Sequence, residues 1–305
     1  MLAVPLRSFD IPVSLQHAVA ADGLTKLTFE NALDFDEYKR QLEFSRSPSI
    51  PPISSTVHTL VLSNFFLGYP AGFLTALGDR LANLHNLTIA NQRFTGTSLE
   101  AAREAERFIT RIPDLVDLHM VDVFLPRGFL SIIGEHQKKK PEAEGLLVLQ
   151  VDYTYREVPS SGGDPITETL ERTSFPEVHM LITPSLSWVS FKMLPHDASG
   201  MIPYWKHATG PLVTALTHDE TAPKALKHLK ITAFQLTLDE LRAVLGKHPR
   251  IMNLDVTLRL ETTDGYLESL CEILGLCPNL CQVEIVTFPT PAVRDVRYPG
   301  RRARA

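Results

Sequence analysis

The chain is poor in the residues that mark several classes of protein. It has three cysteines among 305 residues and a formal net charge of −5. So small and odd a set of cysteines does not build a disulfide framework, and we therefore expect an intracellular location, cytoplasmic or nuclear. A mildly acidic chain lacks the basic face that general nucleic-acid binding requires, so we expect no nucleic-acid partner.

Long apolar runs are also missing. No stretch approaches the ~18 consecutive apolar residues of a membrane span. Arg7 and Asp10 interrupt the N-terminal segment, where a secretory signal needs an unbroken apolar core. We therefore expect neither a signal peptide nor a membrane partner. The hydrophobic fraction of 44% is nonetheless typical of a chain that builds a packed core.

The common motifs of catalysis and cofactor binding are absent too. The sequence contains no Gly-x-Ser-x-Gly and no His-Glu-x-x-His, and Gly162-Gly163 is not followed by Gly-Lys-Ser/Thr. Cys271, Cys277 and Cys281 lack the second pair of ligands that a structural zinc site needs, and we interpret them as buried apolar thiols. We expect no catalytic residue, no metal site and no cofactor.

What the chain has in quantity is a repeated apolar frame. Leu24-x-x-Leu27-x-Phe29 returns as Val57-x-x-Leu60-x-Leu62 and continues along the chain. The second apolar positions of the nine frames are Leu27, Leu60, Leu87, Leu118, Leu149, Leu181, Leu229, Leu254 and Val283. Frames start 25 to 33 residues apart, except for 48 residues between Val178 and Leu226. Such a period indicates a repeat architecture.

Each frame predicts a strand, and the segments between frames predict helices. The alternation at the end of the frame is typical of a strand with one buried face. Apolar residues at helical spacing predict helices over 73–81, 99–109, 238–245 and 267–274, with caps at Thr97 or Ser98, Thr237 and Asp264. Prolines that follow helical patterns, such as Pro113, Pro176 and Pro249, are expected to end a helix and start the next strand.

The frame resembles the leucine-rich repeat, L-x-x-L-x-L-x-x-N/C, and the resemblance covers nearly the whole chain. It implies an α/β fold, a leucine-rich-repeat solenoid (horseshoe) with a parallel sheet on the concave face and helices on the convex face. Asn31, Asn64 and Asn91 close the first three frames. In the family such an asparagine satisfies backbone groups of the neighbouring turn. This ladder weakens from Asp122 onwards.

We predict a single solenoid over residues 1–290 with about nine irregular repeats. An insertion or degenerate repeat falls near 184–222, and a disordered basic tail occupies 291–305. The insertion holds both tryptophans, Trp188 and Trp205. Aromatic residues at this density form either a local core under a loop or an exposed binding anchor.

The residues between the apolar positions of each strand should line the concave face, which is the surface that repeat proteins use for binding. We expect an unidentified protein partner there. The predicted binding residues are Lys26, Thr28, Thr59, Val61, Asn86, Thr88, Asp117, His119, Val148, Gln150, His228, Lys230, Asn253, Asp255, Gln282 and Glu284.

The strand start at Pro278-Asn-Leu280 resembles the repeat region of fungal F-box proteins. That resemblance implies a substrate receptor of a ubiquitin ligase, with the ligase adaptor as a second partner if an F-box is present. No F-box is visible in residues 1–23 or after 290. The alternative is a structural or regulatory scaffold unrelated to ubiquitination. A repeat protein of the GTPase-activating kind would need an acidic tail, whereas Arg301–Arg304 makes this tail basic.

Three histidines, His58, His85 and His179, share the position after the first apolar residue of a frame. Two of them belong to adjacent repeats, where their rings could stack. A metal-binding or pH-sensing role is one interpretation, and a solvated histidine at a strand edge is the one we favour. The short basic run Lys138–Lys140 is interpreted as a solvated loop.

Overall fold

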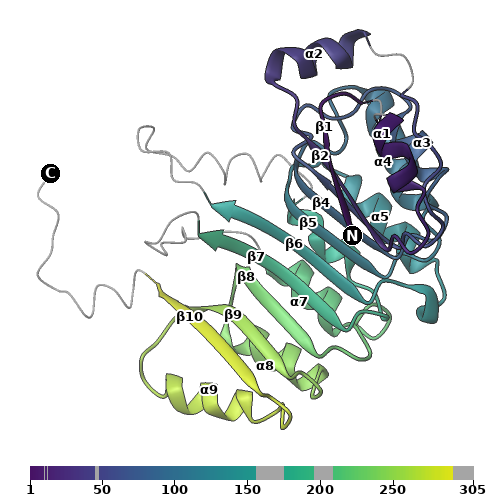
Figure 1. Cartoon of the computed structure of the whole chain (residues 1–305). Helices are drawn as coiled ribbons and strands as arrows, with labels where there is room; N and C mark the ends of the chain where they lie inside the picture. The colour runs from purple at the N-terminus through teal and green to yellow at the C-terminus, as the bar shows by residue number, and fades with distance from the viewer. Residues whose placement is uncertain (10, 12, 45–47, 156–174, 196–208, 291–305) are drawn as a thin grey trace, which may run out of the picture.

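The computed structural model describes residues 1–9, 11, 13–44, 48–155, 175–195 and 209–290. Ten strands form one sheet in which every strand lies beside its neighbours in the chain, from β1 to β10 (Figure 1). All neighbouring strands are parallel. Because each connection advances the chain by one strand, the sheet is open and its elements stack in layers. The predicted fold class, a parallel leucine-rich-repeat solenoid, is confirmed.

The strands are β1 (Leu2–Leu6), β2 (Lys26–Asn31), β3 (Thr59–Ser63), β4 (Asn86–Gln92), β5 (Asp117–Val123), β6 (Val148–Tyr155), β7 (Trp188–Pro195), β8 (His228–Leu236), β9 (Asn253–Leu260) and β10 (Gln282–Pro289). The helices are α1 (Val13–Val19), α2 (Phe35–Phe44), α3 (Phe73–Gly78), α4 (Leu99–Arg111), α5 (Phe129–Lys138), α7 (Gly210–Thr217), α8 (Leu238–Lys247) and α9 (Tyr266–Leu274), with 3₁₀ turns η1 (Glu142–Glu144) and η2 (Phe175–Leu181). Successive members of the series α3, α4, α5, η2, α7, α8 and α9 pack on one another.

The strand register places the second apolar residue of each frame in one buried row. Leu118 pairs with Leu149 across β5 and β6, and both side chains are 0% exposed. On the same strand Gln150 is half-buried. This alternation is what a strand with one covered face requires. Burying each leucine of the row contributes about 1.5–3 kcal/mol.

One frame was assigned to the wrong segment. Leu181 lies in the 3₁₀ turn η2, which packs against α5 in the helical layer. Pro176 lies inside this turn and does not start a strand as expected. The strand is β7, whose frame is Leu186-x-x-Val189-x-Phe191. Val189 pairs with Leu149 and continues the buried row. Both segments bury apolar residues at the same spacing, so the pattern alone did not separate them.

The two ends of the sheet also differ from the prediction. A strand that the frame did not indicate, β1, pairs with β2, and its Val4 and Leu6 are buried. At the other end, Val283 lies in the row as expected but is 44% exposed. Val283 is therefore covered less by the described residues than the other members of the row are.

The backbone conformation near the ends of the strands accounts for the asparagines that recur there. Asn64, Asn91 and Asp122 have positive φ angles of 66°, 51° and 50°, a left-handed conformation that asparagine and aspartate adopt more readily than other side chains. Asn31 plays the role that the resemblance implied, because its Nδ2 donates to the Asn64 carbonyl at 3.1 Å. Asn64 bonds to the side chain of Glu30 instead. The turn geometry thus extends to Asp122, where we expected the ladder to weaken.

Two of the predicted caps are confirmed and one is wrong. The Ser98 side chain accepts a hydrogen bond from the Ala101 amide at the start of α4. Thr237 and Glu240 form a capping box at the start of α8. The helix α9 begins after Gly265 rather than Asp264, so its N-cap residue has no side chain that could cap it.

Candidate binding surface

The register aligns the predicted binding residues in two rows that cross the sheet. The first row is Lys26, Thr59, Asn86, Asp117, Val148, Trp188, His228, Asn253 and Gln282. The second row is Thr28, Val61, Thr88, His119, Gln150, Ser190, Lys230, Asp255 and Glu284. The structure adds Trp188 and Ser190 to these rows. The prediction missed both residues because it placed the frame of this repeat at Leu181.

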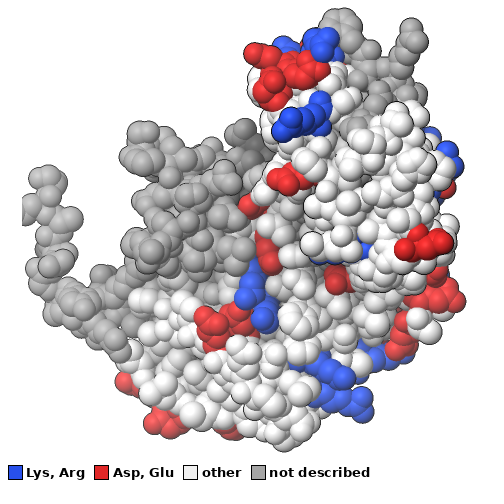
Figure 2. Space-filling view, in the orientation of Figure 1, with Lys and Arg blue, Asp and Glu red and all other residues white. Residues whose placement is uncertain are grey.

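Most of these side chains are half-buried, but the rows are not uniform. Gln282 and Glu284 on β10 are exposed. Asp255 is only 7% exposed, contrary to the expectation of an open face, and its carboxylate is 2.7 Å from Lys192 Nζ. Figure 2 shows acidic and basic side chains close together on the visible surface of the molecule. The face therefore carries paired charges of both signs.

Hydrogen bonds between strands hold several row members in place. Asn86 Nδ2 donates to Thr59 Oγ1 at 3.1 Å. Asn253 Nδ2 lies 2.9 Å from His228 Nδ1. Burial lowers the pKa of His228, with further contributions from Lys230 and Lys227. A neutral imidazole follows at neutral pH, so His228 Nδ1 accepts this bond.

Asp152 joins side chains from three strands. Its Oδ2 lies 3.2 Å from His119 Nε2, and its Oδ1 accepts a bond from Ser190 Oγ at 3.2 Å. Serine, histidine and aspartate are also the residues of a serine hydrolase triad, but here they are hydrogen-bonded in a different order. A nucleophilic serine must face the imidazole that removes its proton, and here the carboxylate lies between them. The cluster orders β5, β6 and β7 and does not activate Ser190.

Trp188 lies at the centre of the first row. The His228 ring stacks on it, with centroids 4.2 Å apart and planes 26° apart. Lys230 Nζ lies 5.3 Å from the centroid of the indole, which is a favourable cation–π distance. Trp188 Nε1 is buried and has no hydrogen-bond partner among the described residues. Lys230 likewise has no carboxylate partner there, in contrast to Lys192.

Asp117 lies two strands from Trp188 in the same row. Its Oδ1 is buried without a hydrogen-bond partner in the described structure. Burial raises the pKa of its carboxyl group, and the charge of His119 partly opposes this. The first row therefore contains a buried, unsatisfied acceptor at Asp117 and a buried, unsatisfied donor at Trp188 among the described residues.

The other candidates from the sequence do not form sites. The His58 and His85 rings lie 6.3 Å apart at 69°, edge to face rather than stacked, and His179 lies in η2 instead of on a strand. Within the described ranges no three His, Cys, Asp or Glu side chains are arranged to hold a metal ion.

The cysteines and the basic run also differ from their interpretations. Cys277 is buried as expected, but Cys271 and Cys281 are exposed. Lys140 is not simply solvated, because its Nζ donates to the Pro113 carbonyl at 2.6 Å. Gly162-Gly163, Trp205 and the tail 291–305 lie outside the described residues. None of the helices that the structure describes has the length and hydrophobicity of a membrane span.

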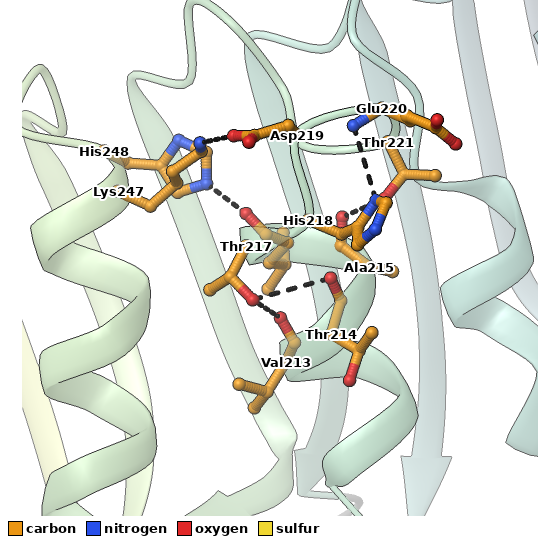
Figure 3. A network of polar contacts seen from close by, with 11 residues as sticks. Val213, Thr214, Ala215, Thr217, His218, Asp219, Glu220, Thr221, Lys247 and His248 are labelled. Atoms are coloured by element: carbon orange, nitrogen blue, oxygen red, sulfur yellow. Dashed lines mark hydrogen bonds and ion pairs between the residues drawn. The ribbon is translucent and has the colours of Figure 1, made fainter.

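A buried histidine lies in the helical layer, away from the rows. His248 is 3% exposed, and its Nε2 is 2.6 Å from the Leu216 carbonyl oxygen. Figure 3 shows this contact between α7 and the end of α8, beside the Lys247–Asp219 ion pair. Burial lowers the pKa of His248, the bond to Leu216 opposes this, and the charge of Lys247 adds to the lowering. The contact joins α7 to the end of α8, and His248 also lines a small pocket together with Lys247, Pro249 and Arg250.

This histidine makes stability depend on pH. Its folded-state pKa lies below the unfolded value of about 6.5, so the unfolded chain takes up the proton first as the pH falls. The stabilisation is present above about pH 6.5 and is lost on acidification. We expect urea unfolding to show a lower free energy of unfolding at about pH 5.5 than at about pH 7.5. His248→Gln should reduce this difference, whereas the exposed His17→Gln should leave it unchanged.

Comparisons with known proteins assign no family to the chain. No family model matches it, and no curated protein matches it either. Among solved structures, it is similar to the leucine-rich repeat-containing protein LegL7 from Legionella pneumophila. The two chains are 12% identical, the match covers 99% of each, and the TM-score is 0.38. The sheet topology establishes the fold independently of this likeness.

Proposed function

We propose that the chain is a non-enzymatic binding module that docks a protein partner on the two rows of its sheet. The observation that carries the proposal is the Trp188 cluster, in which an indole contacts an imidazole and a lysine of the next strand, and the lysine has no counter-ion among the described residues. Tryptophan is enriched among the residues that dominate binding energy at protein interfaces. A sheet of ten parallel strands offers the broad, ordered platform that such an anchor needs.

The cluster also indicates which chemistry the partner presents. The indole N–H is buried, so a partner can contact the accessible part of the Trp188 side chain and Lys230, but not this N–H. The ammonium group of Lys230 favours a carboxylate at the same place. We propose that the partner contributes an aspartate or glutamate next to an apolar side chain that packs on the indole. The rows are therefore a surface for an acidic segment.

The test first recovers a partner by crosslinking it to residues of the sheet face. The affinity of that partner for the chain and its variants is then measured. Trp188→Ala should weaken binding ~30-fold, since truncating an anchor residue of this kind costs ~2 kcal/mol or more. Phe66→Ala is the matched control, because Phe66 is an aromatic residue, 46% exposed, that lies outside both rows. Thermal melting would establish that both variants fold.

Charge reversals extend the test along the rows. Asp117→Lys, Lys230→Glu and Asp255→Lys reverse the charge at three members of the rows, and Gln150→Lys introduces a charge at a fourth. A partner that binds all four variants and Trp188→Ala as tightly as the original chain does not dock on the rows, and the proposal would then be wrong.

A finer proposal is that the partner is a substrate of a ubiquitin ligase. It rests on the resemblance of the Pro278-Asn-Leu280 strand start to F-box proteins, and a regulatory scaffold is the alternative. Recovery of the ligase adaptor with the chain would support the finer proposal. A partner recovered without the adaptor would support the scaffold.

A further inference from the structure

The small pocket beside His248 lies where the chain enters β8 and β9. Its lining comes from two neighbouring layers, because Lys224 and Leu226 precede β8 and the run 247–250 joins α8 to β9. The pocket has a volume of about 230 Å³. Pockets that take drug-sized ligands begin at about 300 Å³, so this one suits a smaller group. None of its lining residues belongs to the two rows.

The lining of the pocket is basic. Lys224, Lys247 and Arg250 contribute to it, and no acidic residue does. Arg250 is exposed and has no carboxylate partner among the described residues. A guanidinium group binds two oxygens of a phosphate at once, and an ammonium group attracts phosphate as a point charge. The lining therefore favours a small anion with several oxygens.

Both lysines of the pocket pair with carboxylates outside it. Lys224 pairs with Glu142 and Lys247 with Asp219. The two acidic side chains are 48% and 89% exposed. Exposed ion pairs contribute little to stability, because water and salt screen them. A ligand with two negative charges can therefore compete with these carboxylates for the ammonium groups.

His248 adds a buried polar group to this lining. The residue is 3% exposed, and its Nε2 lies against the Leu216 carbonyl oxygen. Its other ring nitrogen, Nδ1, has no hydrogen-bond partner among the described residues and is not fully enclosed. In Figure 3 a dashed line reaches only one nitrogen of this ring. A carbonyl only accepts, so Nε2 carries the proton of the neutral ring and Nδ1 becomes a donor when a second proton binds.

The end of α8 opposes an anion at this place. The negative end of a helix dipole is equivalent to about half a charge. The last carbonyl groups are already occupied in part, since the His248 amide donates to those of Val244 and Leu245. Three basic side chains carry a larger charge of the opposite sign. Basic residues also stabilise a helix end without any ligand, and the binding experiment below separates these two roles.

We propose that this pocket binds a phosphate group, either as the free ion or as the monoester of a small molecule. The guanidinium group of Arg250 holds two oxygens, and Lys224 and Lys247 exchange their carboxylates for the others. His248 takes up a proton from solvent when the ligand binds and donates from Nδ1. The proposal is independent of the function of the rows.

Proton uptake makes the affinity depend on pH. The charged groups around the imidazole are Lys247 of α8, Asp219 after α7, Lys224 before β8 and Arg250 before β9, and the Cys277 thiol donates to the His248 carbonyl at 3.5 Å. Burial lowers the pKa of His248, so the free protein holds the ring neutral at neutral pH. An anion favours the charged ring, and by linkage a lower pH favours the anion.

Isothermal titration calorimetry of the full chain with inorganic sulfate tests the proposal at constant ionic strength. Sulfate keeps its charge between about pH 6 and pH 8, whereas a phosphate monoester has a second pKa of about 6. We expect saturable binding that tightens ~3-fold or more from about pH 8 to about pH 6. Titrations in two buffers with different ionisation enthalpies should show proton uptake. At pH 8, tighter binding of glycerol 3-phosphate than of inorganic phosphate would assign the pocket to an organic monoester, and the reverse would assign it to the free ion.

The variants remove one feature of the pocket at a time. Arg250→Gln should weaken binding of sulfate ~10-fold, and Arg250→Lys should weaken it less, because it keeps the charge and loses the fork. His248→Gln should abolish the dependence on pH. The matched control is Lys227→Gln, since Lys227 is an exposed lysine of the segment before β8 that does not line the pocket. Thermal melting would establish that the variants fold.

The control and the row variant Trp188→Ala should bind sulfate as the original chain does. Absence of saturable binding of both sulfate and phosphate would overturn the proposal and leave the basic residues with the helix end alone. Equal weakening by Lys227→Gln and Arg250→Gln would overturn it as well, because the attraction would then be general. An affinity that does not change with pH would overturn the role of His248.

Discussion

Replacing Leu149 with aspartate should abolish cooperative folding. Leu149 is 0% exposed and lies between Leu118 and Val189 in the buried row. Truncation to alanine alone should cost ~2–5 kcal/mol, because it removes buried methyl groups and leaves a cavity. Aspartate adds the cost of a buried charge with no partner, and a domain is stable by only about 5–15 kcal/mol. Urea unfolding followed by circular dichroism would measure both variants.

The next residue provides the control for this prediction. Gln150 belongs to the second row and is half-buried, so Gln150→Ala should cost ~0.5 kcal/mol or less. The contrast between adjacent positions follows from the alternation of a strand. A larger loss for Gln150→Ala than for Leu149→Ala would mean that the strand register is shifted by one residue, and every member of both rows would then face the core.

The repeated frame was sufficient to predict the fold and most of the sheet. It located eight of the ten strands, since the alternation of Leu149 with Gln150 follows directly from packing one face. It failed at η2, where Val178 and Leu181 have the spacing of a strand but pack as a 3₁₀ turn against α5. Short apolar runs do not distinguish the two outcomes. The strand β1 lacks the frame and is specified by its pairing with β2.

The candidate site was predictable to the extent that it follows from register. The sequence predicted which residues of eight strands lie in register on one side of the sheet. Trp188 was not among them, because its strand, β7, was not predicted. The clustering of Trp188 with His228 and Lys230 depends on side-chain packing across two strands. The burial of Asp255 depends on its ion pair with Lys192, which lies 63 residues earlier in the sequence and two strands away in the sheet. No pattern in the neighbouring sequence predicts either contact.

The capping of α5 by a glutamate gives a clearer case of long-range specification. Glu177 caps a helix that begins 49 residues earlier at Gly128, and no capping pattern within α5 announces it. The contact forms only because η2 approaches α5 closely, and the sequence feature that permits this approach is a single glycine. Gly134 lies in the middle of α5, where glycine is otherwise unfavourable.

Gly134→Ala should therefore destabilise the protein although alanine favours the helix. A Cβ atom at Gly134 would lie 2.1 Å from the Met180 carbonyl oxygen and 2.7 Å from its carbon. Both are backbone atoms of η2, so neither can rotate away. The helix gains ~1 kcal/mol from alanine, while forcing apart a packed contact typically costs 1–3 kcal/mol and occasionally more. Displacing η2 also withdraws Glu177 from Gly128, which adds ~1 kcal/mol for the lost cap. We expect a net loss of ~1–3 kcal/mol by urea unfolding.

Gly246 supplies the opposite case within the same fold. It lies in α8, and a Cβ atom there would meet nothing within 4 Å. Gly246→Ala should stabilise the protein by ~0.5–1 kcal/mol, since only the backbone entropy of the unfolded chain changes. The two substitutions are chemically identical and should differ in sign. If Gly134→Ala were stabilising as well, η2 would not lie against α5 as closely as described, and the capping of α5 by Glu177 would lose its structural basis.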